Sequence, residues 1–240
     1  MTNDEQLVLP LAYRPAQGVH DFLVSPSNKA AWQAITLVDS PFAARLALSG
    51  PAGAGKTHLA QIWGGRMGAV GQPLADLTEL SLRGLFEAPA IVLEDADESL
   101  ELPGPARRQV ETLLFHLLNA TMAEGIPLLM TGRTPPARWS VDMPDLASRL
   151  SALPHVALQP PDDALLTEIL RKLFKDRQLA VGADVLEFLI RRMHRSFEAA
   201  EDLVARLDRL SLANRRSITR PLAKELFPDQ TGEPELRGKN

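Results

Sequence analysis

Residues 50–57 read Gly-Pro-Ala-Gly-Ala-Gly-Lys-Thr and form a complete G-x-x-x-x-G-K-[ST] motif. An apolar run precedes the motif and helix-forming residues follow it, which is the strand–loop–helix setting of a phosphate-binding loop. Glycines there let backbone N–H groups turn inward around phosphate oxygens. The pattern predicts that Lys56 reaches the β- and γ-phosphates and that Thr57 holds Mg²⁺ at a helix N-terminus. We therefore expect a nucleoside di- or triphosphate to be bound by the loop and the residue after it: Gly50, Pro51, Ala52, Gly53, Ala54, Gly55, Lys56, Thr57 and His58.

The composition excludes several classes of protein. The chain has 240 residues, 45% of them apolar, which suits one large domain or a nucleotide-binding domain with a small second one. It has no cysteine, which excludes disulfides, thiolate catalysis and Cys-ligated zinc. A net charge of −4 and an isoelectric point near 5.8 argue against a general DNA-binding protein, whose contact surface would be basic.

The sequence shows no signal for secretion or for a membrane. Its first residues are acidic where a secretory signal would be basic. No apolar run approaches the roughly 18 residues of a transmembrane helix. We therefore expect a cytoplasmic protein without a membrane partner.

Short apolar runs alternate with helix-forming segments along the first two thirds of the chain. Buried strands are expected at residues 45–49, 90–93, 127–131 and 156–158. Helices are expected at about 28–38, 57–64, 80–86 and 107–122, with apolar residues spaced for one face. This alternation predicts an α/β fold in which helices flank a parallel sheet with right-handed crossovers.

The pattern changes after Pro160-Pro161. Apolar residues at helical spacing predict four helices, which begin at about residues 162, 183, 196 and 219, and no strand pattern interrupts them. We therefore expect four parts: a flexible arm at 1–18, a nucleotide-binding core at 19–160, a small all-α domain at 161–227 and a disordered tail at 228–240.

An acidic pair ends the second predicted strand. Glu94 and Asp95 follow the apolar residues 91–93, which is the Walker B arrangement, where carboxylates hold Mg²⁺ and orient the attacking water. The first acid is usually Asp, and Glu94 would shift its oxygens by about 1.5 Å. Because a displacement of that size can cost about a hundredfold in rate, we expect slow or absent hydrolysis. The alternative is an acidic strand end that faces solvent.

Two further polar residues stand where nucleotide sites place such groups. Thr131 ends the strand at 127–131, from which a side chain can contact the γ-phosphate or the attacking water. The alternative is that Thr131 has no role in a nucleotide site and is simply the last residue of its strand. Arg149 ends a loop before the final strand and can project into a neighbour's nucleotide to stabilise charge on the γ-phosphate. The alternative is a solvent-exposed arginine on a helix.

Together these elements resemble the AAA+ ATPases, and within them the DnaA-related branch. Residues 21–30, Asp-Phe-Leu-Val-Ser-Pro-Ser-Asn-Lys-Ala, are similar to the DnaA segment that leads into the adenine pocket, which implies a nucleotide contact at Phe22. The resemblance covers about residues 13–226 and implies a P-loop AAA+ core followed by a helical lid. DnaA continues into a helix-turn-helix DNA-binding domain, for which we expect no counterpart here.

The arm carries a second specific motif. Residues 6–11, Gln-Leu-Val-Leu-Pro-Leu, resemble the hexapeptide by which bacterial proteins dock on the sliding clamp of the replicative polymerase. Such a short peptide would bind a preformed groove weakly and reversibly. The same run would also suit a first β-strand. As a clamp peptide, it would make its contacts through Gln6, Leu7, Leu9, Pro10 and Leu11.

A DnaA-like core behind a clamp-binding arm resembles the Hda-type family of regulatory inactivators of DnaA. The resemblance implies ADP or ATP with Mg²⁺ in the core and a tether to sliding clamps loaded on DNA. It also implies that Arg149 acts in trans on ATP-bound DnaA, which prevents a second initiation of replication. It further implies a replisome-associated protein with weak or no ATPase activity of its own, which meets DNA through the clamp. Head-to-tail self-association or a homodimer stays open.

One position departs from the family. Alignment of residues 203–207 with DnaA places Glu198 where the family carries a lid arginine that contacts the phosphates. Either Arg195, one turn earlier, takes that place or the contact is absent. A missing arginine would weaken the sensing of ATP and would suit a regulator that stays bound to ADP.

Two other functions are weighed against this one. An autonomous AAA+ loader or remodeller would hydrolyse ATP itself, against which Glu94 and Glu198 argue. A DnaA-like accessory protein would bind DNA directly. The lid helices do carry many arginines, but acidic residues interleave with them, which favours solvated helix faces.

Overall fold

A computed structural model describes residues 22–36 and 44–227 of the chain. Its five strands form one parallel sheet in the order β2-β3-β4-β1-β5. Arg45 of β1 lies opposite Leu128 of β4, and the pairing runs on to Ser49 and Gly132. The strands are β1 (Arg45–Ser49), β2 (Val70–Pro73), β3 (Ile91–Glu94), β4 (Leu128–Gly132) and β5 (His155–Ala157). The predicted parallel α/β fold is confirmed.

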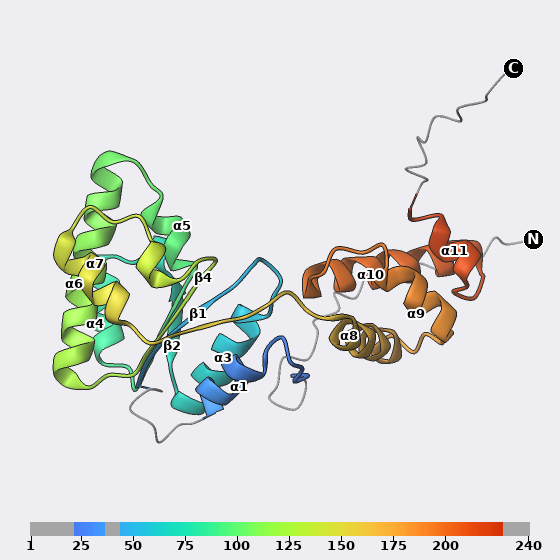
Figure 1. Cartoon of the computed structure of the whole chain (residues 1–240), viewed down its shortest axis with the longest axis horizontal. Helices are drawn as coiled ribbons and strands as arrows, with labels where there is room; N and C mark the ends of the chain where they lie inside the picture. The colour runs from blue at the N-terminus through green and yellow to red at the C-terminus, as the bar shows by residue number, and fades with distance from the viewer. Residues whose placement is uncertain (1–21, 37–43, 228–240) are drawn as a thin grey trace, which may run out of the picture.

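Helices cover both faces of the sheet (Figure 1). On β3, Ile91 and Leu93 enter one apolar core and Val92 enters the other, because successive side chains on a strand point to opposite faces. The first core lies under α4 (Glu79–Phe86), α6 (Gly104–Glu124) and α7 (Pro144–Ala152). The second lies under α1 (Lys29–Thr36) and α3 (Lys56–Met67). Each face of the sheet is thus buried, as its apolar strands require.

Some short elements differ from the predictions. β2 was not predicted, since Val-Gly-Gln-Pro is mostly exposed at the sheet edge and shows no apolar run. The short helix α5 (Ala96–Leu100) and the 3₁₀ turns η2 (Leu74–Asp76) and η3 (Pro136–Arg138) were also missed. Arg149 lies in the last turn of α7 and not at the end of a loop. Pro144 opens that helix, where its missing N–H costs nothing.

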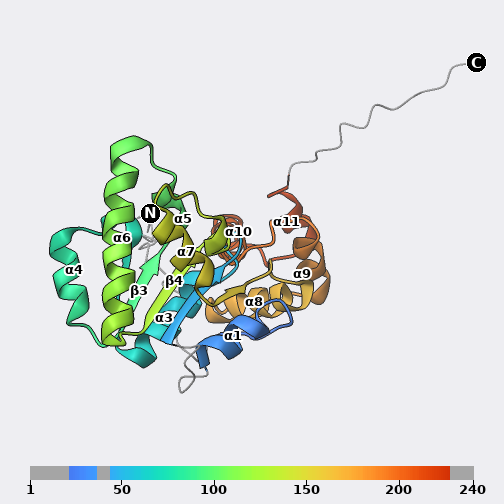
Figure 2. The ribbon, with the colours of Figure 1, turned by 60° about the vertical axis from the view of Figure 1, so that its left-hand side comes forward.

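The last four helices pack around an apolar core of their own. They are α8 (Asp163–Asp176), α9 (Ala183–Ile190), α10 (Phe197–Asn214) and α11 (Arg220–Lys224). Side chains cap two of them: Asp162 accepts from the N–H of Leu165 at 2.8 Å, and Ser196 accepts from that of Ala199 at 3.1 Å. These caps satisfy backbone groups that would otherwise lack partners. The helices form the lid, which lies beyond the carboxyl ends of the strands (Figures 1 and 2).

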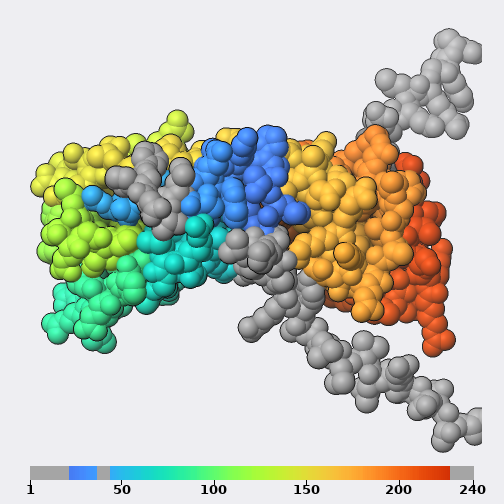
Figure 3. Space-filling model, turned by 90° about the horizontal axis from the view of Figure 1, so that it is seen from below, coloured from blue at the N-terminus to red at the C-terminus, as the bar shows by residue number. Residues whose placement is uncertain are grey.

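Residues 22–36 join the two parts of the molecule. Phe22 packs into the core beneath α3, whereas the adjacent Leu23 packs against the apolar core of the lid. In Figure 3 this segment, drawn in blue, lies on the surface between the core and the orange lid. The predicted clamp peptide, with Gln6, Leu7, Leu9, Pro10 and Leu11, lies outside the described residues, as does the predicted tail at 228–240. None of the helices described here is both long enough and apolar enough to cross a membrane.

Candidate nucleotide site

A cavity of about 490 Å³ opens between the core and the lid. Its floor is the motif loop with the first turn of α3, and the residues that follow β3 and β4 form one wall. Helices α8 and α10 of the lid form the other wall. The lining residues are Leu23, Ala52, Gly53, Gly55, Lys56, Thr57, His58, Asp95, Glu98, Arg133, Ile169, Lys172, Leu173, Phe197, Glu198 and Glu201.

Three glycines of the motif loop have backbone conformations with positive φ. Gly50, Gly53 and Gly55 have φ values of 154°, 69° and 97°. L-residues with a side chain rarely adopt these angles, so glycine is required at each position. Gly55 is the N-cap of α3, and the first residues of that helix line the cavity. The loop is therefore a cradle of backbone donors at a helix N-terminus, as an anion needs.

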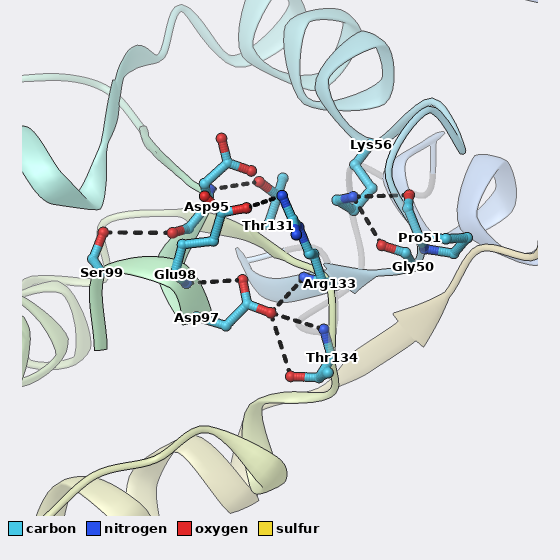
Figure 4. Close-up of polar contacts among 10 residues, drawn as sticks. All are labelled: Gly50, Pro51, Lys56, Asp95, Asp97, Glu98, Ser99, Thr131, Arg133 and Thr134. Carbon is cyan, nitrogen blue, oxygen red and sulfur yellow. Dashed lines mark hydrogen bonds and ion pairs between the residues drawn. The ribbon is translucent and has the colours of Figure 1, made fainter. Parts of the chain in front are cut away.

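Lys56 is held inside this loop (Figure 4). Its Nζ donates to the carbonyl oxygens of Gly50 at 2.8 Å and Pro51 at 3.1 Å, and only 8% of the residue is exposed. Burial lowers the pKa of the ammonium group, while the charges of Asp95 and Asp97 act in the opposite direction. The positive charge thus lies beneath the part of the cavity where phosphates would be bound.

The predicted Asp95 and Thr131 meet at the ends of neighbouring strands. The buried Thr131 hydroxyl accepts a hydrogen bond from the backbone N–H of Asp95 at 3.1 Å. Asp95 has a left-handed conformation, with φ of 50°, and lines the cavity. The contact fixes the turn that carries the carboxylate, because β3 and β4 are paired directly before it. The structure therefore brings Asp95 and Thr131 together beside the motif loop.

Glu94 has a different position. It lines a separate hollow with Gln61 and Gly64 of α3, and it is absent from the lining of the nucleotide cavity. The cause is the alternation of side chains along β3, which turns Glu94 to the face opposite that of Leu93. The predicted magnesium role of Glu94 is not supported by this placement. Asp95 is the acid of the pair that lines the cavity.

Asp97 was not selected from the sequence, yet it organises the wall of the cavity (Figure 4). Its Oδ2 accepts from the backbone N–H groups of Arg133 at 2.6 Å and Thr134 at 2.9 Å. The side chain is buried, so these bonds are shielded from water. They position Arg133, whose guanidinium pairs with Glu98 at 2.5 Å. No pattern in the sequence links Asp97 to Arg133 and Thr134, which lie 36 and 37 positions further along the chain.

The first turn of α10 rests directly on the motif loop. The N–H of Phe197 donates to the carbonyl oxygen of Gly53 at 3.0 Å. A methyl group in place of the Gly53 hydrogen would lie 2.3 Å from Cβ of Ser196, and one at Gly55 would lie 3.3 Å from the Phe197 ring. The two glycines therefore serve the approach of the lid as well as the turn of the loop.

The lid brings negative charge to the cavity. Glu198 and Glu201 both line it, and burial raises the pKa of Glu201, an effect that Arg177 opposes and Glu198 reinforces. Arg195 is not among the lining residues. Its guanidinium instead pairs with Asp163 at 2.7 Å and donates to the carbonyl of Pro161 at 3.2 Å. The structure thus does not bring the predicted Arg195 to the site.

Phe22 lies beneath the cavity and not in its wall. Its ring stacks on Trp32 at 5.0 Å between centroids and meets the His58 ring edge-on at 5.3 Å. Only 8% of Phe22 is exposed, and the neighbouring Leu23 lines the cavity instead. Phe22 therefore supports His58 and α1 from inside the core, and the structure does not place this predicted contact residue among those that line the cavity.

Arg149 lies apart from the nucleotide cavity. Its side chain is half-buried, with the guanidinium 5.3 Å from the centre of the Phe115 ring and 3.8 Å from Sδ of Met122. It lines a hollow of about 340 Å³ together with Arg45 and Leu118. Helix α7, which carries it, lies on the side of the core away from the lid (Figure 1). Arg149 therefore cannot act on a nucleotide in its own cavity.

The residues of the cavity fit a nucleoside phosphate with Mg²⁺. The positive-φ glycines and Lys56 suit the phosphates, and Thr57 offers a hydroxyl group beside them. Asp95 offers a carboxylate oxygen, which Mg²⁺ prefers. When bound, the metal would neutralise phosphate charge next to Lys56.

Similarity to known proteins agrees with this architecture. Residues 163–227 match the family model of the Hda lid domain. The fold is similar to domain III of the replication initiation protein DnaA from Thermotoga maritima, with 22% identity, a TM-score of 0.74, and coverage of 89% of this chain and 96% of that one. AMPPCP-bound DnaA from Aquifex aeolicus is similar at 17% identity and a TM-score of 0.71, over 89% of this chain and 70% of that one.

The RuvB Holliday junction branch migration motor of Thermotoga maritima shares the fold as well, with 16% identity, a TM-score of 0.68 and coverage of 88% and 70% of the two chains. Similarity at these identities shows the AAA+ fold alone. The lid match is the more specific finding, because it assigns residues 163–227 to the Hda lid domain that the motifs indicated. An Hda lid domain at residues 163–227, behind a core that shares the fold of DnaA domain III, fits an Hda-type, DnaA-related protein.

Proposed function

We propose that this protein stimulates the hydrolysis of ATP bound to DnaA and so acts as a negative regulator of replication initiation. The observation that carries the proposal is the position of Arg149, outside the chain's own nucleotide cavity and on an exposed helix of the opposite side. An arginine so placed can complete a site only on another molecule. Supplied to a γ-phosphate in trans, such a finger accelerates hydrolysis by about 10³ to 10⁵. The Hda lid supports DnaA as that other molecule.

The chain's own nucleotide, ADP or ATP with Mg²⁺, serves structure and regulation in this proposal. It binds on the loop at Lys56 and Thr57 and joins the core to the lid. Glu198 and Glu201 disfavour additional negative charge near the phosphates. ADP carries less charge than ATP, so we propose ADP as the working ligand. The chain itself then hydrolyses ATP slowly or not at all.

The arm supplies a tether. In the proposal, residues 6–11 dock on the DNA-loaded sliding clamp, which raises the local concentration of the protein at newly replicated DNA. A weak contact between the two AAA+ proteins then suffices. Replacing Gln6 and Leu7 by alanine should abolish co-elution with the clamp and leave nucleotide affinity unchanged. If the variant still co-elutes with the clamp, residues 6–11 are not a clamp-binding peptide, and the alternative of an ordinary β-strand holds.

The experiment that tests the function follows ATP pre-bound to DnaA, with and without this protein and the DNA-loaded clamp. Acceleration that requires both additions supports the proposal. No acceleration, with the protein hydrolysing ATP unaided at more than about 1 s⁻¹, would identify an autonomous ATPase. One observation favours that second candidate: Asp95 and Lys56 both line the cavity, and Thr131 holds the backbone of Asp95.

A further inference from the structure

The arginines of the lid differ in whether a carboxylate pairs with them. Five of them have carboxylate partners among the ion pairs of the described residues: Arg171 pairs with Glu168, Arg191 with Glu187, Arg195 with Asp163, Arg206 with Asp202 and Arg216 with Glu225. Arg192 and Arg220 have no ion pair within residues 22–36 and 44–227. Both are exposed. The interleaved acids of the sequence therefore pair with some lid arginines and leave others, Arg192 and Arg220 among them, without an ion pair in the described residues.

Arg192 and Arg220 are held on the same aromatic ring. The guanidinium carbon of Arg192 lies 4.2 Å from the centre of the Phe188 ring, and that of Arg220 lies 5.5 Å from it. Phe188 is 3% exposed and meets Phe227 edge-on at 5.9 Å, so the ring is fixed in the lid core. Stacking on a fixed ring orders each side chain before any ligand arrives, which lowers the entropy cost of binding.

Two like charges held over one ring repel each other, and an anion relieves that repulsion. Guanidinium groups stacked by one face keep their outer N–H groups for hydrogen bonds in the plane, which suits the paired oxygens of phosphates. We propose that the Arg192–Arg220 pair is a contact site for the phosphate backbone of duplex DNA, independent of its sequence.

The position of the pair fits this partner. Arg192 follows α9 and Arg220 opens α11, at the end of the lid away from the core (Figure 1). The nucleotide cavity and Arg149 thus stay free when this end is occupied. The choice of duplex DNA rests on the proposed function, in which the clamp holds the protein beside such DNA. A weak contact suffices there, because only two phosphates need be engaged.

Binding of the full chain to a fluorescent DNA duplex tests the site, without clamp or DnaA. Fluorescence anisotropy between 20 and 150 mM salt gives the affinity and its salt dependence. We expect Arg192→Ala with Arg220→Ala to weaken binding severalfold and to lower the slope of log K against log salt by about 2. The matched control, Arg191→Ala with Arg206→Ala, removes two arginines that have acidic partners and should change both values less.

A third variant, Arg192→Lys with Arg220→Lys, keeps the charge but loses the planar guanidinium, and should give an intermediate affinity. Equal melting temperatures for all variants would exclude a loss of folding as the cause. Equal effects of the test and control pairs, or no binding of the wild-type chain to DNA, would overturn the proposal. So would preferential binding of an acidic peptide such as polyglutamate. The failure of this site would leave the clamp-dependent test of DnaA hydrolysis untouched.

Discussion

The nucleotide cavity and the face around Arg149 belong to the same core, and they differ in how their charged groups are held. Lys56 is buried and donates two hydrogen bonds to loop carbonyls. Arg149 is half-buried and rests on the Phe115 ring and on Met122 Sδ, each contact worth about 1 kcal/mol. The cation beneath the cavity is thus fixed before a ligand binds, whereas the other can leave its resting contacts at low cost. A fixed cation suits a resident nucleotide, and a releasable one suits a partner molecule.

Removal of the Arg149 side chain should give the largest effect of the variants considered, and it should change the stimulation of DnaA without changing the nucleotide cavity. Arg149→Ala should lower clamp-dependent hydrolysis by DnaA by about 10³-fold or more, because the γ-phosphate loses its trans cation. Affinity for ADP should not change, since Arg149 does not line the cavity. Single-turnover hydrolysis and isothermal calorimetry measure the two quantities. An unimpaired variant would remove Arg149 from the mechanism.

Loss of the loop lysine should have the converse effect. Lys56→Ala should weaken ADP binding by about thirtyfold, which corresponds to about 2 kcal/mol for a lost hydrogen bond between charged groups. Calorimetric titration with Mg·ADP measures it. The Arg149 face should remain intact, so saturating ADP should restore stimulation of DnaA. Failure to restore it would mean that the two faces are coupled through the core.

Substitution of Gly53 tests whether the loop needs contact with the lid. Gly53→Ala should cost about 1–2 kcal/mol for the left-handed backbone alone, and the new methyl group would collide with Ser196. We expect about tenfold weaker ADP binding and a lower melting temperature. Gly65→Ala is the matched control, because a methyl group there meets nothing within 4 Å and alanine favours a helix. Equal effects of the two changes would argue against the lid contact.

The lid acids should produce a smaller effect, on the choice of nucleotide. Glu198→Gln should improve ATP affinity by about twofold to fivefold relative to ADP, since it removes a partly solvated like charge beside the phosphates. Competition between labelled ATP and ADP measures the ratio. Glu168→Gln removes an acid from the same domain that lies outside the cavity and should leave the ratio unchanged. An unchanged ratio in Glu198→Gln would show that the lid does not select the nucleotide.

The smallest effect expected is a dependence on pH. Burial raises the pKa of Glu201 above 4.5, so the folded protein binds this proton more tightly than the unfolded chain does. The ionised form therefore costs stability, and that cost grows as the pH rises from 4.5 through the raised pKa. ADP affinity should also improve as the pH falls through this window, because protonation of Glu201 removes a negative charge from the wall of the cavity. The difference in ADP affinity between pH 5 and pH 7 should be smaller in Glu201→Gln. Calorimetric titration with ADP at the two pH values measures it.

The fold could be predicted where the sequence signal is local. The strand β3 and the helix α10 follow from apolar spacing and caps, and the loop at 50–57 follows from its motif. The edge strand β2 could not be predicted, because its exposed Val-Gly-Gln-Pro residues gain their hydrogen bonds only from β3. A strand without an apolar pattern, such as β2, can be predicted only when the strand that pairs with it is known.

The site shows the same division. The motif predicts the positions of Lys56 and Thr57, whereas the choice between Glu94 and Asp95 depends on which face of β3 each side chain takes. Asp97 organises a loop that lies 36 residues further along the chain, and no spacing rule reveals that contact. Arg195 has a suitable charge for a phosphate, but Asp163 pairs with it in the structure.

The most direct test places a radioactive label on one nucleotide at a time. In one reaction DnaA carries γ-³²P-ATP and this protein carries unlabelled ADP, and in the other the labelled ATP is bound to this protein. The account predicts that the label on DnaA is released, that release requires Arg149, and that the label on this protein stays bound as ATP. Release of the label from this protein at the same rate, with DnaA's label unchanged, would contradict it.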